Sequence, residues 1–199
     1  MIPRRLLLFS FLCVASSARA QRGPAPTKHD RITPPEGDEI DGALRRLMRF
    51  LTALYRPLDE LGNRVDAIRY RNALRTLAAD LEKLLQAKTK LRNRLRERPV
   101  DRDQVVSDLR DIRDLVTGVS TQVEEMAAGL RASFAEEGNK VANQLHEAAA
   151  AKTWIQILQN NISTFSGEQL RGYAERADQT IPILRDTVEA ASRLRTYVN

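Results

Sequence analysis

The sequence predicts an all-α protein in which a three-helix antiparallel bundle base carries a long two-helix coiled-coil hairpin arm. Apolar residues recur in alternating steps of three and four along three long runs, which is the heptad signature of packed helices. No run shows the alternation that a half-buried strand requires. Only 5% of the residues are aromatic and 29% are charged, which is typical of long, thin helices rather than of a compact globule.

Residues 1–20, MIPRRLLLFSFLCVASSARA, have the pattern of a cleaved export signal. A basic start is followed by a short apolar core and by Ala18-Arg19-Ala20, the small-x-small sequence that signal peptidase accepts. The apolar core is too short to span a bilayer, so we expect no transmembrane segment and a periplasmic or secreted product that begins at Gln21. The only cysteine, Cys13, leaves with the signal, so the mature chain is expected to form no disulfide.

Residues 21–38 are predicted to be a disordered, proline-rich linker, because they contain four prolines and two glycines but one large apolar residue. The first helix is predicted to follow in two heptad phases, one over residues 40–68 and the other over residues 70–95. It ends before Pro99, because the residue that precedes a proline resists helical geometry.

Two capping boxes mark the starts of the other two helices. The two boxes are Asp101 with Gln104 and Ser166 with Gln169. In each box the first side chain is expected to accept a hydrogen bond from a free backbone amide of the helix, and the second side chain to bind the backbone amide of the first residue. We expect one unbroken helix from the first box to residue 162, and a last helix from the second box to residue 198.

The numbering of the apolar positions predicts how the helices pair, because antiparallel helices joined by a tight turn bring together residues whose numbers have a constant sum. Eight pairs between residues 70–95 and 105–130 add to 200, and fifteen of these sixteen positions are apolar, Lys88 being the exception. These residues, 70–130, are the predicted hairpin arm. The last helix matches the second at a sum of 332, which predicts a base built from residues 39–69 and 131–199.

The tip of the predicted arm is strongly basic. Residues 88–102 contain two acidic residues and seven basic ones, a net charge of +5: Lys88, Lys90, Arg92, Arg94, Arg96, Arg98 and Arg102. After loss of the three signal arginines the whole chain carries 29 basic and 26 acidic groups, so the positive excess is concentrated at this tip. The charges predict either a solvated end that keeps arms apart or a docking surface for an anionic partner.

For a docking surface outside the cytoplasm, the expected partner is an envelope protein or an anionic surface such as lipid headgroups or lipopolysaccharide. Nucleic acid is not expected, because no aromatic residues interleave with the tip charges to stack bases.

Gly62 and Gly138 are predicted to lie at one height, since their numbers also add to 200. Glycine weakens a helix, so two at one level indicate either a hinge or a close approach of two helices.

The chain lacks the recognisable sequence patterns of an active site. His29 and His146 are too far apart in the predicted arrangement to share a metal, and no phosphate-binding loop or nucleophile motif is present. We therefore expect no enzymatic activity, no metal site and no cofactor.

These observations predict an exported, non-enzymatic helical interaction protein of the cell envelope, an adaptor or scaffold that docks through its basic tip. Two alternatives remain, a periplasmic holdase-type chaperone and a helical component of a secretion or pilus system, both by analogy of architecture alone. A holdase needs several arms around a cavity and hence a homo-oligomer, whereas a docking arm functions as a single chain.

Overall fold

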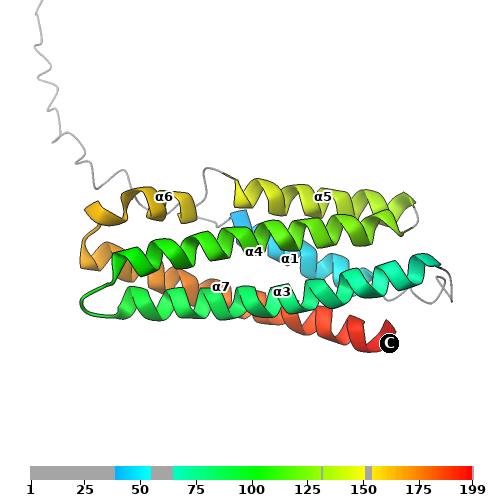
Figure 1. The fold of residues 1–199 in the computed structure, drawn as a ribbon, viewed down its shortest axis with the longest axis horizontal. Helices are drawn as coiled ribbons and strands as arrows, with labels where there is room; N and C mark the ends of the chain where they lie inside the picture. The colour runs from blue at the N-terminus through cyan, green and yellow to red at the C-terminus, as the bar shows by residue number, and fades with distance from the viewer. Residues whose placement is uncertain (1–38, 55–64, 131, 151–153, 199) are drawn as a thin grey trace, which may run out of the picture. The chain divides into compact units, whose positions relative to one another are not determined.

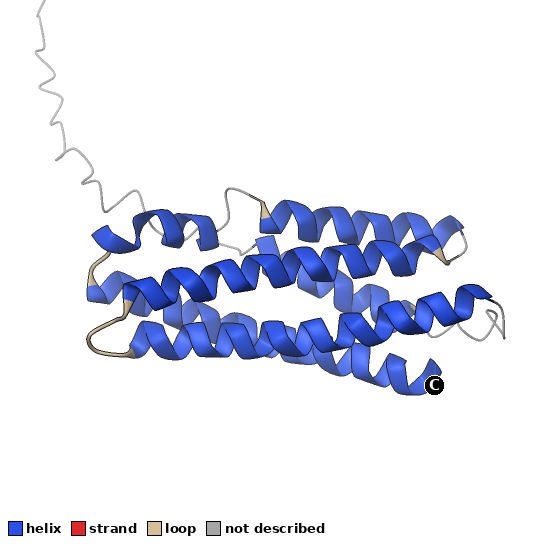
Figure 2. Cartoon of the chain, in the orientation of Figure 1, coloured by secondary structure: helices blue, strands red, loops and turns tan. Residues whose placement is uncertain are grey.

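Residues 39–54, 65–130, 132–150 and 154–198 are described by the computed structural model, and nearly all of them are helical (Figure 1 and Figure 2). The elements are α1 (Glu39–Ala53), α3 (Val65–Arg96), α4 (Arg102–Ala128), α5 (Ala132–Ala149), α6 (Trp154–Asn161), the 3-10 helix η1 (Ile162–Thr164) and α7 (Gly167–Val198). This part of the chain contains no strand, so the predicted all-α class is confirmed. The predicted signal (1–20), the predicted linker (21–38) and Gly62 lie outside the described residues.

The helices form a bundle-like ring in which each long helix packs against two others. α3 contacts α4 and α7, α4 also contacts α5, and α1 closes the ring by contacting both α5 and α7. The short helix α6 lies along α4 beyond the end of α5, as Figure 1 shows.

Both predicted helix starts are observed, and the second of them carries the full capping box. The Asp101 carboxylate accepts a hydrogen bond from the Gln104 amide at 3.0 Å and caps α4. At the start of α7 the box is reciprocal, because the Gln169 amide donates to Ser166 Oγ at 3.2 Å and the Ser166 amide donates to Gln169 Oε1 at 2.8 Å. These bonds satisfy amides that have no partner inside the helix.

The seam between α3 and α4 is buried as the apolar pattern predicts. Fifteen of the sixteen seam residues are buried, and Leu130 is half-buried. Asp108 contacts both Lys90 and Arg94, and Gly118 lies beside Asp80, so the observed pairs add to 198, 202 and 198. These sums lie on either side of the predicted 200.

The predicted unbroken helix from residue 101 to 162 is wrong. α4 ends at Ala128, and α5 folds back along α4, where Ser120 Oγ donates to the Ala142 carbonyl at 2.7 Å. The sequence does carry the signal of this turn, a change of heptad phase between Leu130 and Phe134. Folding back buries the apolar stripe of α5 against that of α4, which a continuous helix cannot do.

The predicted division into a base and a free arm is not confirmed. The sequence pairs the last helix with residues 134–162, but α7 packs along α3, where Lys88 meets Thr180 and Arg92 meets Asp178. The constant-sum test cannot choose between helices, because any two helices with the same heptad period satisfy it at several registers. With α7 along its side, α3 is not half of an isolated two-helix arm.

One hydrophobic core runs through all the long helices. It extends from Ile40 on α1 to Leu194 on α7 and includes the α3–α4 seam in the same cluster. No helix in the described ranges combines the length and the apolar character needed to cross a membrane.

Candidate functional site

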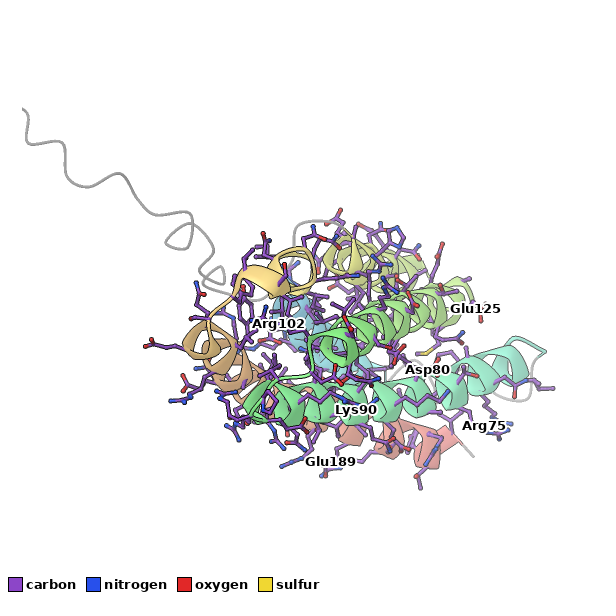
Figure 3. The ribbon with its side chains drawn as sticks, turned by 60° about the vertical axis from the view of Figure 1, so that its left-hand side comes forward. Arg75, Asp80, Lys90, Arg102, Glu125 and Glu189 are labelled. Carbon is purple, nitrogen blue, oxygen red and sulfur yellow. The ribbon has the colours of Figure 1, made fainter. Side chains whose placement is uncertain are left out.

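The seven basic residues singled out by the sequence lie on the last turns of α3, on the connection that follows and on the first residue of α4. We call them the basic end. Figure 3 labels two of them, Lys90 on α3 and Arg102 at the start of α4. α3 stops at Arg96, ahead of Pro99, so the chain turns here and brings the two helices together.

Lys88 does not belong to an exposed docking surface. Its side chain is fully buried, its Nζ donates to Thr180 Oγ1 at 3.2 Å, and the same nitrogen lies 3.7 Å from Asp41 Oδ1. Asp41 is on α1 and Thr180 is on α7, so this one ammonium ties three helices together. An apolar seam tolerates a lysine here because the buried charge has a carboxylate and a hydroxyl to face.

Lys90 and Arg94 share one buried carboxylate. Lys90 Nζ lies 2.8 Å from Asp108 Oδ1, and Arg94 Nε lies 2.6 Å from Asp108 Oδ2. The Asp108 side chain is only 2% exposed, whereas that of Lys90 is 54% exposed. Two cations on α3 therefore bind a single acid on α4, and this cluster keeps one positive charge.

Arg92 and Arg96 share a second carboxylate in the same way. Arg92 Nη1 lies 3.3 Å from Asp178 Oδ1, and Arg96 Nη2 pairs with Asp178 Oδ2. Asp178 is on α7, and the Arg96 side chain is 50% exposed. This cluster joins α3 to α7, and it too keeps one positive charge.

Arg98 and Arg102 bind backbone carbonyls instead of acids. Arg98 donates to the Gly167 carbonyl at 3.3 Å, and Arg102 donates to the carbonyls of Ser163 and Phe165, the latter at 3.1 Å. These contacts hold the connection between η1 and α7 against the turn between α3 and α4.

The Phe165 ring anchors the same connection. It is buried and packs on the buried Tyr173 with 5.4 Å between ring centroids. Burial raises the pKa of the Tyr173 phenol to about 12, because the charged form loses its hydration there.

The local charge is much smaller than the sequence suggests. Three acids from outside residues 88–102 reach this end of the bundle: Asp41, Asp108 and Asp178. They reduce the net charge of the cluster from +5 to +2.

The sequence did not predict that these three acids lie beside the basic residues. The position of Asp108 could have been predicted, because the sum of 200 places it between Lys90 and Arg94. The position of Asp178 could not, because the apolar pattern assigned α7 to a different neighbour.

Gly138, one of the two proposed hinge glycines, marks a close helix approach. It is buried on α5, and a Cβ atom added there would lie 2.6 Å from Ala127 Cβ and 2.9 Å from Phe50 Cζ. The absence of a side chain lets α5 pack closely against α4 and α1, which is the second of the two interpretations of this glycine. Gly62 is outside the described residues.

Two further features bear on ligand binding. A hollow of about 530 Å³ lies on α3 beside the basic end, with Lys90, Asn93, Arg94 and Glu97 among its lining residues. In the part of the chain that the structure describes, no three His, Cys, Asp or Glu side chains gather as metal ligands, and His146 is exposed on α5.

No protein-family model, no curated protein and no solved structure matches this chain.

Proposed function

We propose that the chain is an exported, non-enzymatic helical interaction protein of the cell envelope that docks an acidic partner through its basic end. The observation that carries the proposal is the sharing of one carboxylate by two cations in each of two clusters. Each cluster has a surplus positive charge, and its outer cation, Lys90 or Arg96, is half exposed.

Cations held in this way suit recognition. Lys90 and Arg96 are restrained by the acids they face, so less side-chain entropy is lost when a partner binds. The hollow beside them on α3 offers apolar surface next to the charge, since Leu85 is among its lining residues. Lys88 has no part in the proposed surface, because it is buried.

The export pattern of residues 1–20 supports the envelope location. It also narrows the choice of partner, because the expected anions outside the cytoplasm are acidic proteins and lipid or polysaccharide surfaces. We favour a protein, because surplus charges in fixed positions recognise a defined arrangement of carboxylates.

The test is photo-crosslinking in the native host, with the photoreactive amino acid at Glu97. This position is exposed and lines the hollow, and replacing it breaks none of the ion pairs of the basic end. The control carries the same amino acid at Glu125, which is exposed on α4. One recurrent protein adduct at Glu97 and none at Glu125 is the expected result. Equal adducts at both positions, or no adduct at either, would contradict docking through the basic end.

A charge variant makes the test sharper. Lys90→Gln with Arg96→Gln removes the two surplus cations but leaves Arg94 with Asp108 and Arg92 with Asp178. We expect capture at Glu97 to fall about tenfold while the fold is kept, since a few rim charges contribute on the order of 1–2 kcal/mol. The control, Lys83→Gln with Arg193→Gln, removes two exposed cations elsewhere and should leave capture unchanged.

Oligomeric state separates this proposal from the holdase alternative. Light scattering on the mature protein should give a monomer, because a docking surface needs no second copy. A stable oligomer that captures many unrelated clients would favour a chaperone instead.

A further inference from the structure

We propose that the hollow between α1 and α5 is a second interaction surface, which binds a short acidic amphipathic helix of a partner protein. The hollow has a volume of about 630 Å³ and is lined by Arg46, Arg49, Phe50, Ala53, Phe134 and Glu137. It shares no residue with the basic end, so the inference goes beyond the proposed function.

The α1 wall of the hollow is a regular helical stripe. Its four residues stand at positions i, i+3, i+4 and i+7, which on a helix form one face about two turns, or roughly 10 Å, long. Phe134 and Glu137 form the facing wall one turn along α5. A trough between two packed helices, two turns long, is the geometry into which a third short helix fits.

The floor of the hollow is aromatic. Phe50 is 3% exposed and packs beside Gly138, while Phe134 is half-buried and faces the hollow from α5. The missing side chain of Gly138 sets the depth of this site, because it allows the Phe50 ring to lie against α5. One or two large apolar side chains of an incoming helix would cover the exposed part of the Phe134 ring and lie over Phe50.

The rim of the hollow is basic. Arg46 and Arg49 are exposed, and neither forms an ion pair with any residue in the described ranges, in contrast to Arg92, Arg94 and Arg96 of the basic end. The Arg49 guanidinium donates only to the backbone carbonyl of Arg45, at 3.4 Å. Arg45 is exposed as well, so this stretch of α1 presents three exposed arginines, whereas Glu137 is the one acid among the described residues that line the hollow.

The combination selects the occupant by its chemistry. Carboxylates along the edges of the partner's helix would face Arg46 and Arg49. Leucine or phenylalanine side chains on the inner face of that helix would pack on the aromatic floor of the hollow. Such an interface is small, so we expect weak and reversible binding.

The test is fluorescence anisotropy with the full chain and a synthetic labelled probe, a helical peptide with leucines at i and i+4 flanked by glutamates. A second peptide with lysines in place of the glutamates is the matched probe. We expect the acidic peptide to bind at least about tenfold more tightly than the basic one. Equal binding of the two peptides, or no binding of either, would overturn the proposal.

Variants locate the binding. Arg46→Glu with Arg49→Glu should weaken the acidic peptide at least about tenfold, whereas Arg110→Glu with Arg185→Glu, an equal charge change at two exposed arginines on other helices, should change it less than about twofold. Ala53→Trp should also block binding, because Ala53 is exposed at the hollow and the indole fills it without removing a core atom. If Ala53→Trp leaves the affinity unchanged, the peptide binds elsewhere and the proposal fails.

The same variants distinguish the proposed helix from two other occupants. A dimer in light scattering that is lost in Arg46→Glu with Arg49→Glu would show a second copy of this chain in the hollow instead. Binding to vesicles of one part phosphatidylglycerol and three parts phosphatidylcholine, lost in the same variant and with no peptide binding, would show an anionic lipid instead. Crosslinking at Glu97 is unaffected by any of these outcomes, so the two proposals fail separately.

Discussion

Asp108 shows how one side chain can organise the end of a helical bundle. Asp108 lies on α4, and its carboxylate is almost inaccessible to solvent. The carboxylate contacts Lys90 and Arg94 on α3. A buried carboxylate is costly by itself, and the two cations offset that cost. The two cations in turn depend on Asp108 for their positions.

Replacement of this carboxylate should therefore destabilise the fold. We expect Asp108→Asn to lower the free energy of unfolding by about 1–3 kcal/mol. This loss is smaller than the loss expected when a fully buried ion pair is broken, because Lys90 and Arg94 are both partly exposed and water can solvate them. Urea denaturation measures the loss. Asp111→Asn, an exposed acid on the same helix, should change the free energy by less than about 0.5 kcal/mol. Equal losses in the two variants would show that the cluster contributes nothing specific.

Two buried tyrosines predict a loss of stability in alkali. Burial raises the pKa of Tyr173 from 10.0 to about 12 and raises the pKa of Tyr70 further. In the unfolded chain a phenol ionises near pH 10, so between pH 10 and about 12 the unfolded state binds fewer protons than the native state. Stability is then complete below pH 10 and falls as the pH rises through this window.

The measurement is urea denaturation at pH 9 and pH 11. Tyr173→Phe should lose less stability between these two values than the unaltered protein, because phenylalanine has no proton to lose. Absorbance at 295 nm follows the ionisation of the tyrosines in the native protein. If all four tyrosines ionise together near pH 10, the prediction is contradicted.

At the scale of elements, the packing of α5 against α4 and α1 depends on a single missing side chain. The space beside Gly138 is occupied by Ala127 on one neighbour and Phe50 on the other. Since Ala127 Cβ is fixed to its backbone, an added methyl group forces the helices apart.

We therefore expect Gly138→Ala to cost about 1–3 kcal/mol in spite of the better helix propensity of alanine. Gly172→Ala on α7 is the matched change, because nothing lies within 4 Å of its added Cβ. That variant should gain up to about 1 kcal/mol. Thermal unfolding followed by circular dichroism separates them, and a gain in both would show that α5 is not tightly packed at Gly138.

The same elements show how much of the fold could be predicted from the sequence. The heptad runs and the capping boxes located the helices and the α3–α4 seam, because both depend on local spacing. The turn after Gly129 and the neighbour of α7 were missed, because they depend on which apolar faces meet, and faces of equal period are interchangeable. The basic residues were found, but Asp178, the acid that pairs with Arg92 and Arg96, lies on the helix that was assigned to the wrong neighbour.

At the scale of the whole molecule, the single core implies that the helices lose their structure together. Leu81 is buried in the α3–α4 seam, yet it belongs to the same cluster as Leu184 and Leu194 on α7. A division into arm and base would confine the effect of a change at Leu81 to residues 70–130.

Leu81→Ala should instead weaken the whole bundle by about 2–5 kcal/mol. Hydrogen exchange measured by mass spectrometry should rise in α7 as well as in α3 and α4. Faster exchange restricted to residues 70–130, with α7 unchanged, would restore the separate arm.

The contacts of Arg98 and Arg102 have a consequence for what a substitution can undo at this end of the bundle. The ties that pass through Asp108 and Asp178 each depend on one side chain, so replacing that side chain releases them. A peptide carbonyl is not removed by changing a side chain. Loss of the two acids should therefore loosen the lateral contacts among α3, α4 and α7, while the connection between η1 and α7 stays fastened to the turn at the end of α3. The bundle would open along its sides before its end.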